Sequence, residues 1–122
     1  MKIGILGSRT LANHPDIYDK IYDILEEYKD DNPTVLHGGA EGVDQKTHRV
    51  CKQLSIDTVV LKPYFKLAKC PVKVDDFFIR NQQILDNSDL MILFSDEEHS
   101  DVRFIMEVAK KQRKKCIVLT YK

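Results

Sequence analysis

The residues with the clearest potential for chemistry form the segment 37–44, His-Gly-Gly-Ala-Glu-Gly-Val-Asp. This glycine-rich segment follows a short apolar run and precedes a stretch with helical spacing. Glycines at a strand-to-helix turn let the backbone approach a ligand closely, and a helix N-terminus favours a phosphate. The spacing matches neither the G-x-G-x-x-G dinucleotide pattern nor the P-loop. Taken alone, the segment leaves two interpretations open: a phosphate-binding turn, or a tight turn whose glycines only adopt positive φ.

Two further groups carry residue types that recognise phosphate. Gly7-Ser8-Arg9 places a flexible turn, a hydroxyl and a guanidinium after the first apolar run. Arginine binds phosphate through two parallel hydrogen bonds, although Arg9 taken alone is interpreted as an exposed loop side chain. Arg80-Asn81 lies in a helical stretch, with Asn81 on its apolar side, where an unpaired amide would be costly. We therefore predict a ligand contact for Arg80 and a hydrogen bond to a loop for Asn81.

The remaining chemically capable residues are interpreted mainly as structural. Asp44 lies in the first turn of a helix, where it complements the dipole and would accept hydrogen bonds from loop amides or a ribose hydroxyl. His37 has the chemistry of a general acid or base, but a packed loop histidine is the favoured interpretation. His48 and Cys51 have a spacing that metal ligands use, yet no second pair supports them, so no zinc site is expected. The acidic run 96–98 predicts a solvated loop, with magnesium binding as the alternative.

Composition is typical of a single globular domain covering residues 1–122. The chain is 43% hydrophobic and 31% charged, with a formal net charge of +0 and a pI near 6.9. This neutrality argues against a broad nucleic-acid surface and leaves a local basic groove open. No apolar run has the length of a membrane span or the pattern of a signal peptide. The cysteines at 51, 70 and 116 are odd in number and widely spaced, which predicts free thiols in the cytoplasm.

Alternating apolar patterns predict the elements that position these residues. Strands are expected at residues 2–6, 34–37, 57–61, 90–94 and 116–119. Helices are expected from Pro15 to residue 28 and over 43–54, 77–85 and 102–109. This alternation is typical of an α/β fold, a five-stranded parallel sheet of order 3-2-1-4-5 with helices on both faces. Since ligands bind beyond the carboxyl ends of such strands, the special residues are expected to converge there.

The three motifs, in this order, resemble the SLOG superfamily of Rossmann-like proteins, and within it the small YspA-like proteins (DUF2493). The resemblance covers nearly the whole chain and implies a single-domain, Rossmann-like nucleotide-binding fold that forms a homodimer or larger homo-oligomer. The residues 39–44, 47–49 and 78–81 also resemble the DNA-processing protein DprA, and the fold is similar to that of the LOG phosphoribohydrolases. Many of these relatives carry a glycine-rich phosphate-binding turn after the fourth strand. Here the segment 94–102 is acidic and lacks glycine, and Phe104 stands where the LOG enzymes have a catalytic glutamate, with Glu107 one turn further on.

These observations predict the binding of a nucleotide or an ADP-ribose-like ligand at the strand ends, as a sensor or sequestering module. The expected ligand-binding residues are Gly7, Ser8, Arg9, His37, Gly38, Gly39, Ala40, Gly42, Asp44, Arg80, Asn81 and Ser95. Whether the chain is an enzyme is left open. One alternative is an N-glycosidase acting on a nucleoside monophosphate through Asp44, Asp96 or Glu107. The other is DprA-like binding of single-stranded nucleic acid, which the neutral charge disfavours. No cofactor, metal or membrane partner is expected.

Overall fold

The computed structural model describes residues 1–11, 13–39, 42–62, 74–96 and 100–121. Its strands are β1 (Lys2–Gly7), β2 (Thr34–His37), β3 (Asp57–Val60), β4 (Leu90–Ser95) and β5 (Lys115–Thr120). Its helices are α1 (Ile17–Tyr28), α2 (Val43–Leu54), α3 (Val74–Asp86) and α4 (Ser100–Lys111), with short 3-10 turns at Arg9–Leu11 and Lys29–Asp31. Ala40, Cys70, Glu97 and Glu98, on which parts of the sequence interpretation depend, lie outside the described residues.

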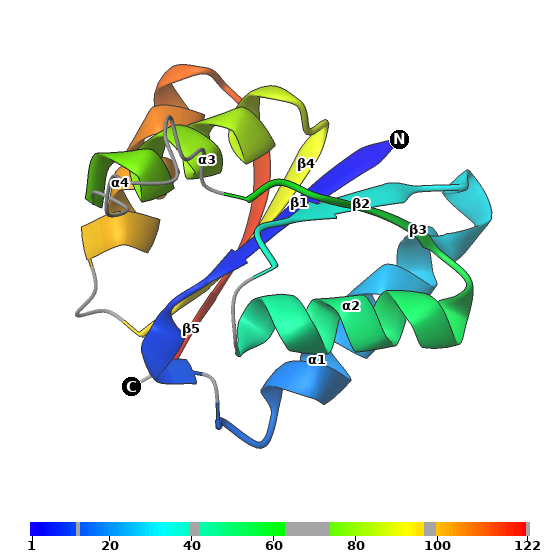
Figure 1. Cartoon of the computed structure of the whole chain (residues 1–122). Helices are drawn as coiled ribbons and strands as arrows, with labels where there is room; N and C mark the ends of the chain where they lie inside the picture. Colours follow the sequence, from blue (N-terminus) through cyan, green and yellow to red (C-terminus); the bar gives the residue numbers. More distant parts are fainter. Residues whose placement is uncertain (12, 40–41, 63–73, 97–99, 122) are drawn as a thin grey trace, which may run out of the picture.

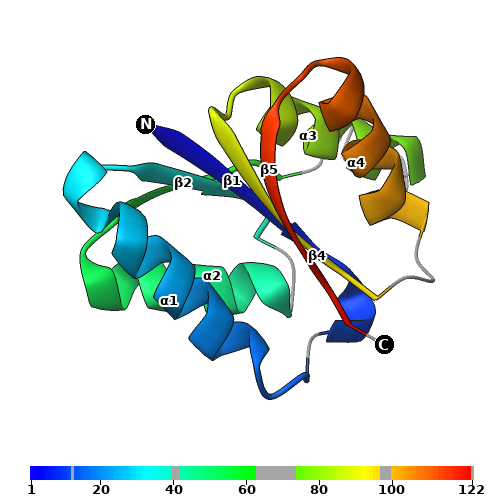
Figure 2. The same cartoon turned by 180° about the vertical axis from the view of Figure 1, so that it is seen from behind.

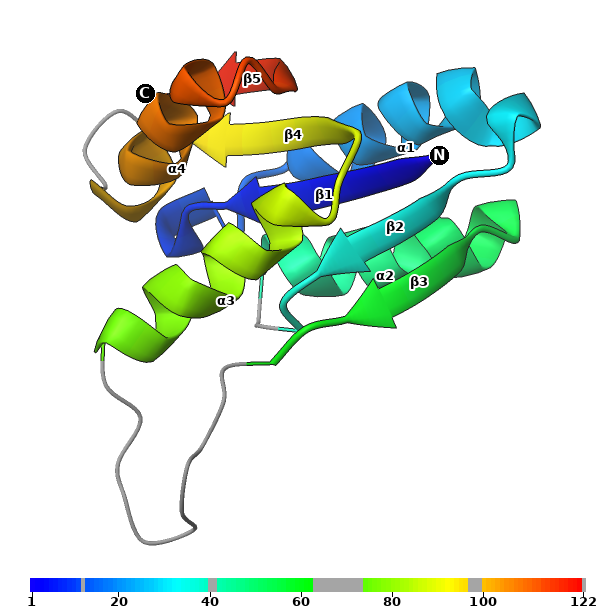
Figure 3. The ribbon, with the colours of Figure 1, turned by 90° about the horizontal axis from the view of Figure 1, so that it is seen from above.

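The strands form one parallel sheet in the order β3-β2-β1-β4-β5, which Figure 3 shows from above. Helices α1 and α2 cover one face of this sheet, and α3 and α4 cover the other (Figures 1 and 2). The predicted α/β architecture and strand order are therefore confirmed. Because all the strands of this sheet pair in parallel, their carboxyl ends lie along the same edge.

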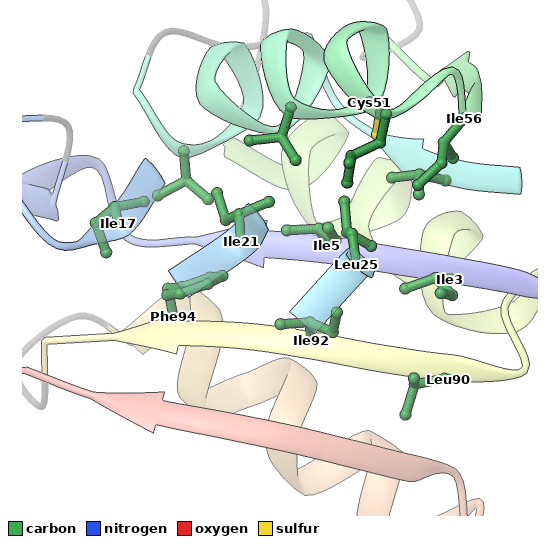
Figure 4. Close-up of a cluster of buried hydrophobic side chains, with 14 of the residues drawn as sticks. Ile3, Ile5, Ile17, Ile21, Leu25, Cys51, Ile56, Leu90, Ile92 and Phe94 are labelled. Atoms are coloured by element: carbon green, nitrogen blue, oxygen red, sulfur yellow. The ribbon is translucent and has the colours of Figure 1, made fainter. Parts of the chain in front are cut away.

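Strand β4 shows why the apolar pattern predicts this layering. All of its residues are buried, as expected for a continuous apolar run with both faces covered. Leu90, Ile92 and Phe94 point into a first core cluster with α1 and α2, part of which Figure 4 shows. Met91 and Leu93 point into a second core cluster with α3 and α4. Alternate side chains of one strand thus hold both helical layers to the sheet.

Helix α1 follows its predicted apolar stripe but begins later than expected. Ile17, Ile21 and Leu25 are fully buried in the first core cluster (Figure 4). Pro15 is not the first helical residue, because the helix begins at Ile17. The His14 ring explains the difference, since its Nδ1 accepts a hydrogen bond from the Asp16 N–H at 3.2 Å and closes a separate turn. The ring supplies an acceptor that the first turn of a helix lacks.

Within the described part of the chain, none of the helices combines the length and apolar character that crossing a membrane requires.

Candidate functional site

The glycine turn after β2 is held by an arginine from the other side of the sheet. Arg80, in α3, is buried and donates from Nη1 to the Gly38 carbonyl oxygen at 3.1 Å. Its Nε donates to the Asn81 side-chain oxygen at 2.8 Å. The Asn81 side chain was predicted to bond to a loop. This prediction is wrong, because its oxygen accepts a hydrogen bond from the neighbouring Arg80. The two residues act together, because Asn81 orients the guanidinium that holds the turn.

Space, and not positive φ, explains why residue 38 is a glycine. A Cβ on Gly38 would meet the Arg80 guanidinium and would lie 3.0 Å from Oδ2 of Asp44. Asp44, in the first turn of α2, is buried and lies on the same side of Gly38 as Arg80. The later glycines differ, since Gly39 and Gly42 have φ values of 71° and 92°. Both structural roles therefore occur in this turn, and a ligand contact of Arg80 remains a prediction.

His37 is packed beneath the same turn, as the favoured interpretation expected. Only 2% of the residue is exposed, and its Nδ1 accepts a hydrogen bond from the Gly39 N–H at 3.1 Å. Its Nε2 lies 3.3 Å from Nδ1 of His48 in α2. Burial, followed by the nearby His48 and Arg80, lowers the pKa of His37 to about 4. His37 is therefore neutral at physiological pH.

A pocket of about 380 Å³ opens beside this histidine pair. The described residues that line it are His37, Gly39, Asp44, Gln45, His48, Arg49, Val60 and Lys62. The sequence analysis did not select Gln45, Arg49 or Lys62 as site residues. Two signals point to them: helical neighbours four residues apart share a face, and Lys62 follows β3 at the carboxyl edge of the sheet. The pocket combines two cations and two imidazoles with one carboxylate, a composition that suits an anion.

The end of β1 contributes a hydroxyl with no visible function in the fold. Ser8 is fully buried, and its Oγ has no hydrogen-bond partner among the described residues. Its backbone is satisfied, because Ser8 N–H donates to the Phe94 carbonyl at 3.0 Å and its carbonyl accepts from Leu11. The preceding Gly7 lets β1 approach α2 closely, since a Cβ there would lie 2.5 Å from Val43 Cγ2. Of Arg9 only the backbone, in a 3-10 turn, belongs to the described part.

The three candidate catalytic carboxylates lie in different surroundings. Asp96, directly after β4 and the buried Ser95, accepts a hydrogen bond from the Thr10 hydroxyl and so joins two strand-end loops. Asp44 lies in the first turn of α2, close to Gly38, while Glu107 lines a separate hollow of about 290 Å³ on α4. Glu107 therefore lies apart from Asp44, which lines the other pocket. In the described part of the chain, no three His, Cys, Asp or Glu side chains are grouped so that they could hold a metal ion.

Comparison with known proteins places the fold but not the activity. No protein-family model and no curated protein sequence matches this chain. DprA from Helicobacter pylori, described with a single-stranded DNA binding mode, matches with a TM-score of 0.77 and 18% identity over 100% of this chain and 66% of its own. DprA from Streptococcus pneumoniae matches with a TM-score of 0.80 and 15% identity over 96% and 49%. The chain thus spans about two thirds and about half of these two proteins.

A molybdenum cofactor binding protein from Rippkaea orientalis matches with a TM-score of 0.74 and 18% identity, over 99% of this chain and 77% of its own. The molybdenum cofactor carrier protein of Chlamydomonas reinhardtii matches similarly, with a TM-score of 0.73 and 15% identity over 98% and 77%. These likenesses show a shared Rossmann-like fold. DprA, which the sequence motifs resemble, is among the proteins that have it.

Proposed function

We propose that this chain binds a nucleotide or a nucleotide-derived, ADP-ribose-like ligand at the carboxyl ends of its strands, as a sensor or sequestering module. The observation that carries the proposal is the buried Ser8 hydroxyl, which has no partner among the described residues. Leaving such a group unpaired costs about 1–3 kcal/mol, so the orphan hydroxyl that follows β1 indicates a missing polar partner. The carboxyl edge of the sheet is where open α/β folds bind ligands.

Three further features support the nucleotide class. The buried Arg80 holds the Gly38 carbonyl group, so this position at the end of β2 is fixed before a ligand arrives. The pocket of about 380 Å³ beside it suits a small phosphorylated molecule. Proteins with the same fold are described as binding molybdenum cofactor or single-stranded DNA. We also assign the chain to the YspA-like group of the SLOG superfamily, as one cytoplasmic domain that forms a homo-oligomer.

The proposal is tested by removing the orphan hydroxyl. AMP, ADP and ADP-ribose are titrated into wild type and Ser8→Ala by calorimetry, and the unliganded melting temperatures are compared. The unliganded variant should be as stable as wild type or more stable, since an unpaired buried hydroxyl is lost. Its affinity for the nucleotide that binds should fall by roughly five- to tenfold, the value of one hydrogen bond.

Tyr121→Phe is the matched control. Tyr121 also has a buried hydroxyl with no partner among the described residues, but it packs against the first core cluster. It should change stability in the same direction and leave nucleotide affinity unchanged. If none of the nucleotides binds wild type at millimolar concentration, or if Ser8→Ala binds as tightly as wild type, the proposal is wrong.

Single-stranded nucleic acid is the second candidate ligand. The likeness to DprA favours it, as do the cations Arg49 and Lys62 at the pocket. Binding through phosphates must weaken steeply as salt rises. A mobility-shift series with a labelled oligonucleotide at increasing salt decides between this candidate and a single bound nucleotide. For the N-glycosidase alternative, Asp44 is the candidate carboxylate that lines the pocket, whereas Asp96 accepts a hydrogen bond from Thr10 and Glu107 lines a separate hollow.

A further inference from the structure

We propose that the pocket between β3 and α2 holds the ligand's phosphate through the imidazole of His48 and the cationic side chains of Arg49 and Lys62. His37 is then a positioning residue, which decides which ring nitrogen of His48 carries the proton. The inference rests on the proposed function in taking the ligand to be a phosphorylated nucleoside. It gives a specific role to His37, which the sequence analysis counted among the expected ligand-binding residues, and to His48, which it considered only as a metal ligand.

The hydrogen bond from Gly39 determines the tautomer of His37. A backbone N–H can only donate, so His37 Nδ1, 3.1 Å from the Gly39 nitrogen, must be an acceptor. A neutral imidazole carries one proton, which therefore lies on His37 Nε2. That nitrogen is 3.3 Å from Nδ1 of His48, so His37 donates to His48. The proton of a neutral His48 must then lie on Nε2, the ring nitrogen that does not face His37.

This arrangement turns His48 into a hydrogen-bond donor for the pocket. His48 is exposed and lines the pocket, as do Arg49, from the same helix, and Lys62, which follows β3. Three donors from two elements thus surround a space of about 380 Å³. The carboxylate of Asp44 also lines the pocket and lies close to Gly38, so the two cations of the pocket face a single carboxylate. Such a set of donors fits the oxygen atoms of a phosphate.

Burial keeps His37 neutral, so that its proton stays on Nε2 and faces His48. His37 is 2% exposed, and its pKa of about 4 leaves it neutral when the ligand binds. The charged and titratable groups around it are His48 and Arg49 on α2, Arg80 on α3, Lys62 after β3 and Asp44 in the turn. Only the last of these favours a protonated His37. A protonated His37 would still donate through Nε2 but would lose the bond from Gly39.

A metal ion shared by the two rings fits the contacts less well. Ligating histidines donate their second N–H to an acceptor, whereas His37 Nδ1 faces the Gly39 N–H, a donor. The described residues also hold no third ligand grouped with the two histidines. The contacts therefore favour a hydrogen bond by which His37 sets the tautomer of His48.

Two substitutions of His37 separate its two hydrogen bonds. His37→Asn places an amide oxygen near the position of Nδ1, which keeps the bond from Gly39 but removes the donor to His48. His37→Gln places an amide nitrogen near the position of Nε2, which keeps the donor to His48 but removes the acceptor for Gly39. A purely structural role under the turn predicts that His37→Asn is the milder change. Our proposal predicts the opposite for phosphate binding.

The probes are ribose 5-phosphate, inorganic phosphate and AMP, titrated calorimetrically at neutral pH. His37→Asn should weaken ribose 5-phosphate binding by roughly twofold, since only part of His48 would then carry its proton on Nε2. His37→Gln should recover most of that loss. His48→Ala and Lys62→Gln should each weaken binding by about tenfold. Nitrogen-15 NMR of the rings should show the proton of His48 on Nε2 in wild type and in His37→Gln, and a mixture of tautomers in His37→Asn.

The outcomes separate this inference from the proposed function. If AMP binds and Ser8→Ala weakens it while His48→Ala has no effect, the inference is wrong and the proposed function stands. If AMP does not bind but ribose 5-phosphate does, with the expected losses in His48→Ala and His37→Asn, the phosphate site and the role of His37 stand, and the nucleotide class is wrong. A wild-type NMR spectrum with the His48 proton on Nδ1 overturns the inference on unsubstituted protein.

Discussion

Gly38→Ala tests whether the glycine turn is shaped by the buried arginine. The new methyl group would occupy space now filled by the Arg80 guanidinium and would approach Asp44 Oδ2 to 3.0 Å. All three residues are buried, so a displaced Arg80 guanidinium would leave the partners that it now bonds to. The bond from Arg80 Nη1 to the Gly38 carbonyl, now 3.1 Å long, would break or stretch.

Two effects set the size of the expected loss. Overpacking a well-filled interior costs about 1–3 kcal/mol. Losing a hydrogen bond from a charged donor costs about 1.5–3 kcal/mol, although part of this is shared with the overpacking term. We expect a loss of roughly 2–4 kcal/mol in the free energy of unfolding. For a chain of this length that corresponds to a fall of roughly 8–16 °C in melting temperature.

A double-mutant cycle with Arg80→Met identifies the partner in this clash. Methionine keeps the apolar stem of Arg80 and removes the guanidinium that the new methyl group would meet. Urea unfolding should show that Gly38→Ala costs much less in the Arg80→Met background, with a coupling of at least about 1 kcal/mol. If the two changes add to within about 0.5 kcal/mol, the methyl group does not act through Arg80 and the reasoning is refuted.

The remaining predictions concern titratable groups. The pKa of His37 is lowered from 6.5 unfolded to about 4 folded, so the unfolded chain binds the extra proton first as pH falls. Its stability contribution, up to about 3 kcal/mol, is complete above pH 6.5 and is lost between pH 6.5 and 4. The urea midpoint of wild type should therefore fall across this range, and in His37→Gln it should depend less on pH. The same pH dependence in both proteins would contradict the shift. Cys51 is fully buried, and burial raises the pKa of its thiol to about 12. In a variant with Cys51 as the sole cysteine, a colorimetric thiol reagent should react only when the protein unfolds. Rapid labelling of the native protein would contradict this burial.

Local patterns were sufficient to predict most of the fold. The apolar stripe of Ile17, Ile21 and Leu25 predicts the buried face of α1, and the unbroken run in β4 predicts burial on both sides. The alternation of strand and helix then restricts the topology, and the order β3-β2-β1-β4-β5 follows the prediction. The start of α1 was predicted less accurately, because a side-chain contact with the backbone, that of the His14 ring with the Asp16 N–H, decides it.

The candidate site could be located but not resolved from the sequence. Glycines and phosphate-recognising side chains after successive strands predict a ligand edge, since parallel strands end together. The assignment of Arg80 to ligand contact missed that two of its donors are engaged with Gly38 and Asn81. Arg49 and Lys62 were not chosen as site residues, because their positions on a helix face and after β3 indicate the ligand edge but not the pocket that they line.

The sequence by itself determined the strands, the helices, their order in the sheet and the edge at which special residues gather, because these depend on periodicity and chirality along the chain. Only the tertiary structure decided which polar groups meet. Arg80 reaches Gly38 across 42 residues, His37 meets His48 across 11, and the Ser8 hydroxyl is buried without a partner among the described residues. Packing between distant elements selects such partners, and burial then removes the water that would otherwise compete for their hydrogen bonds.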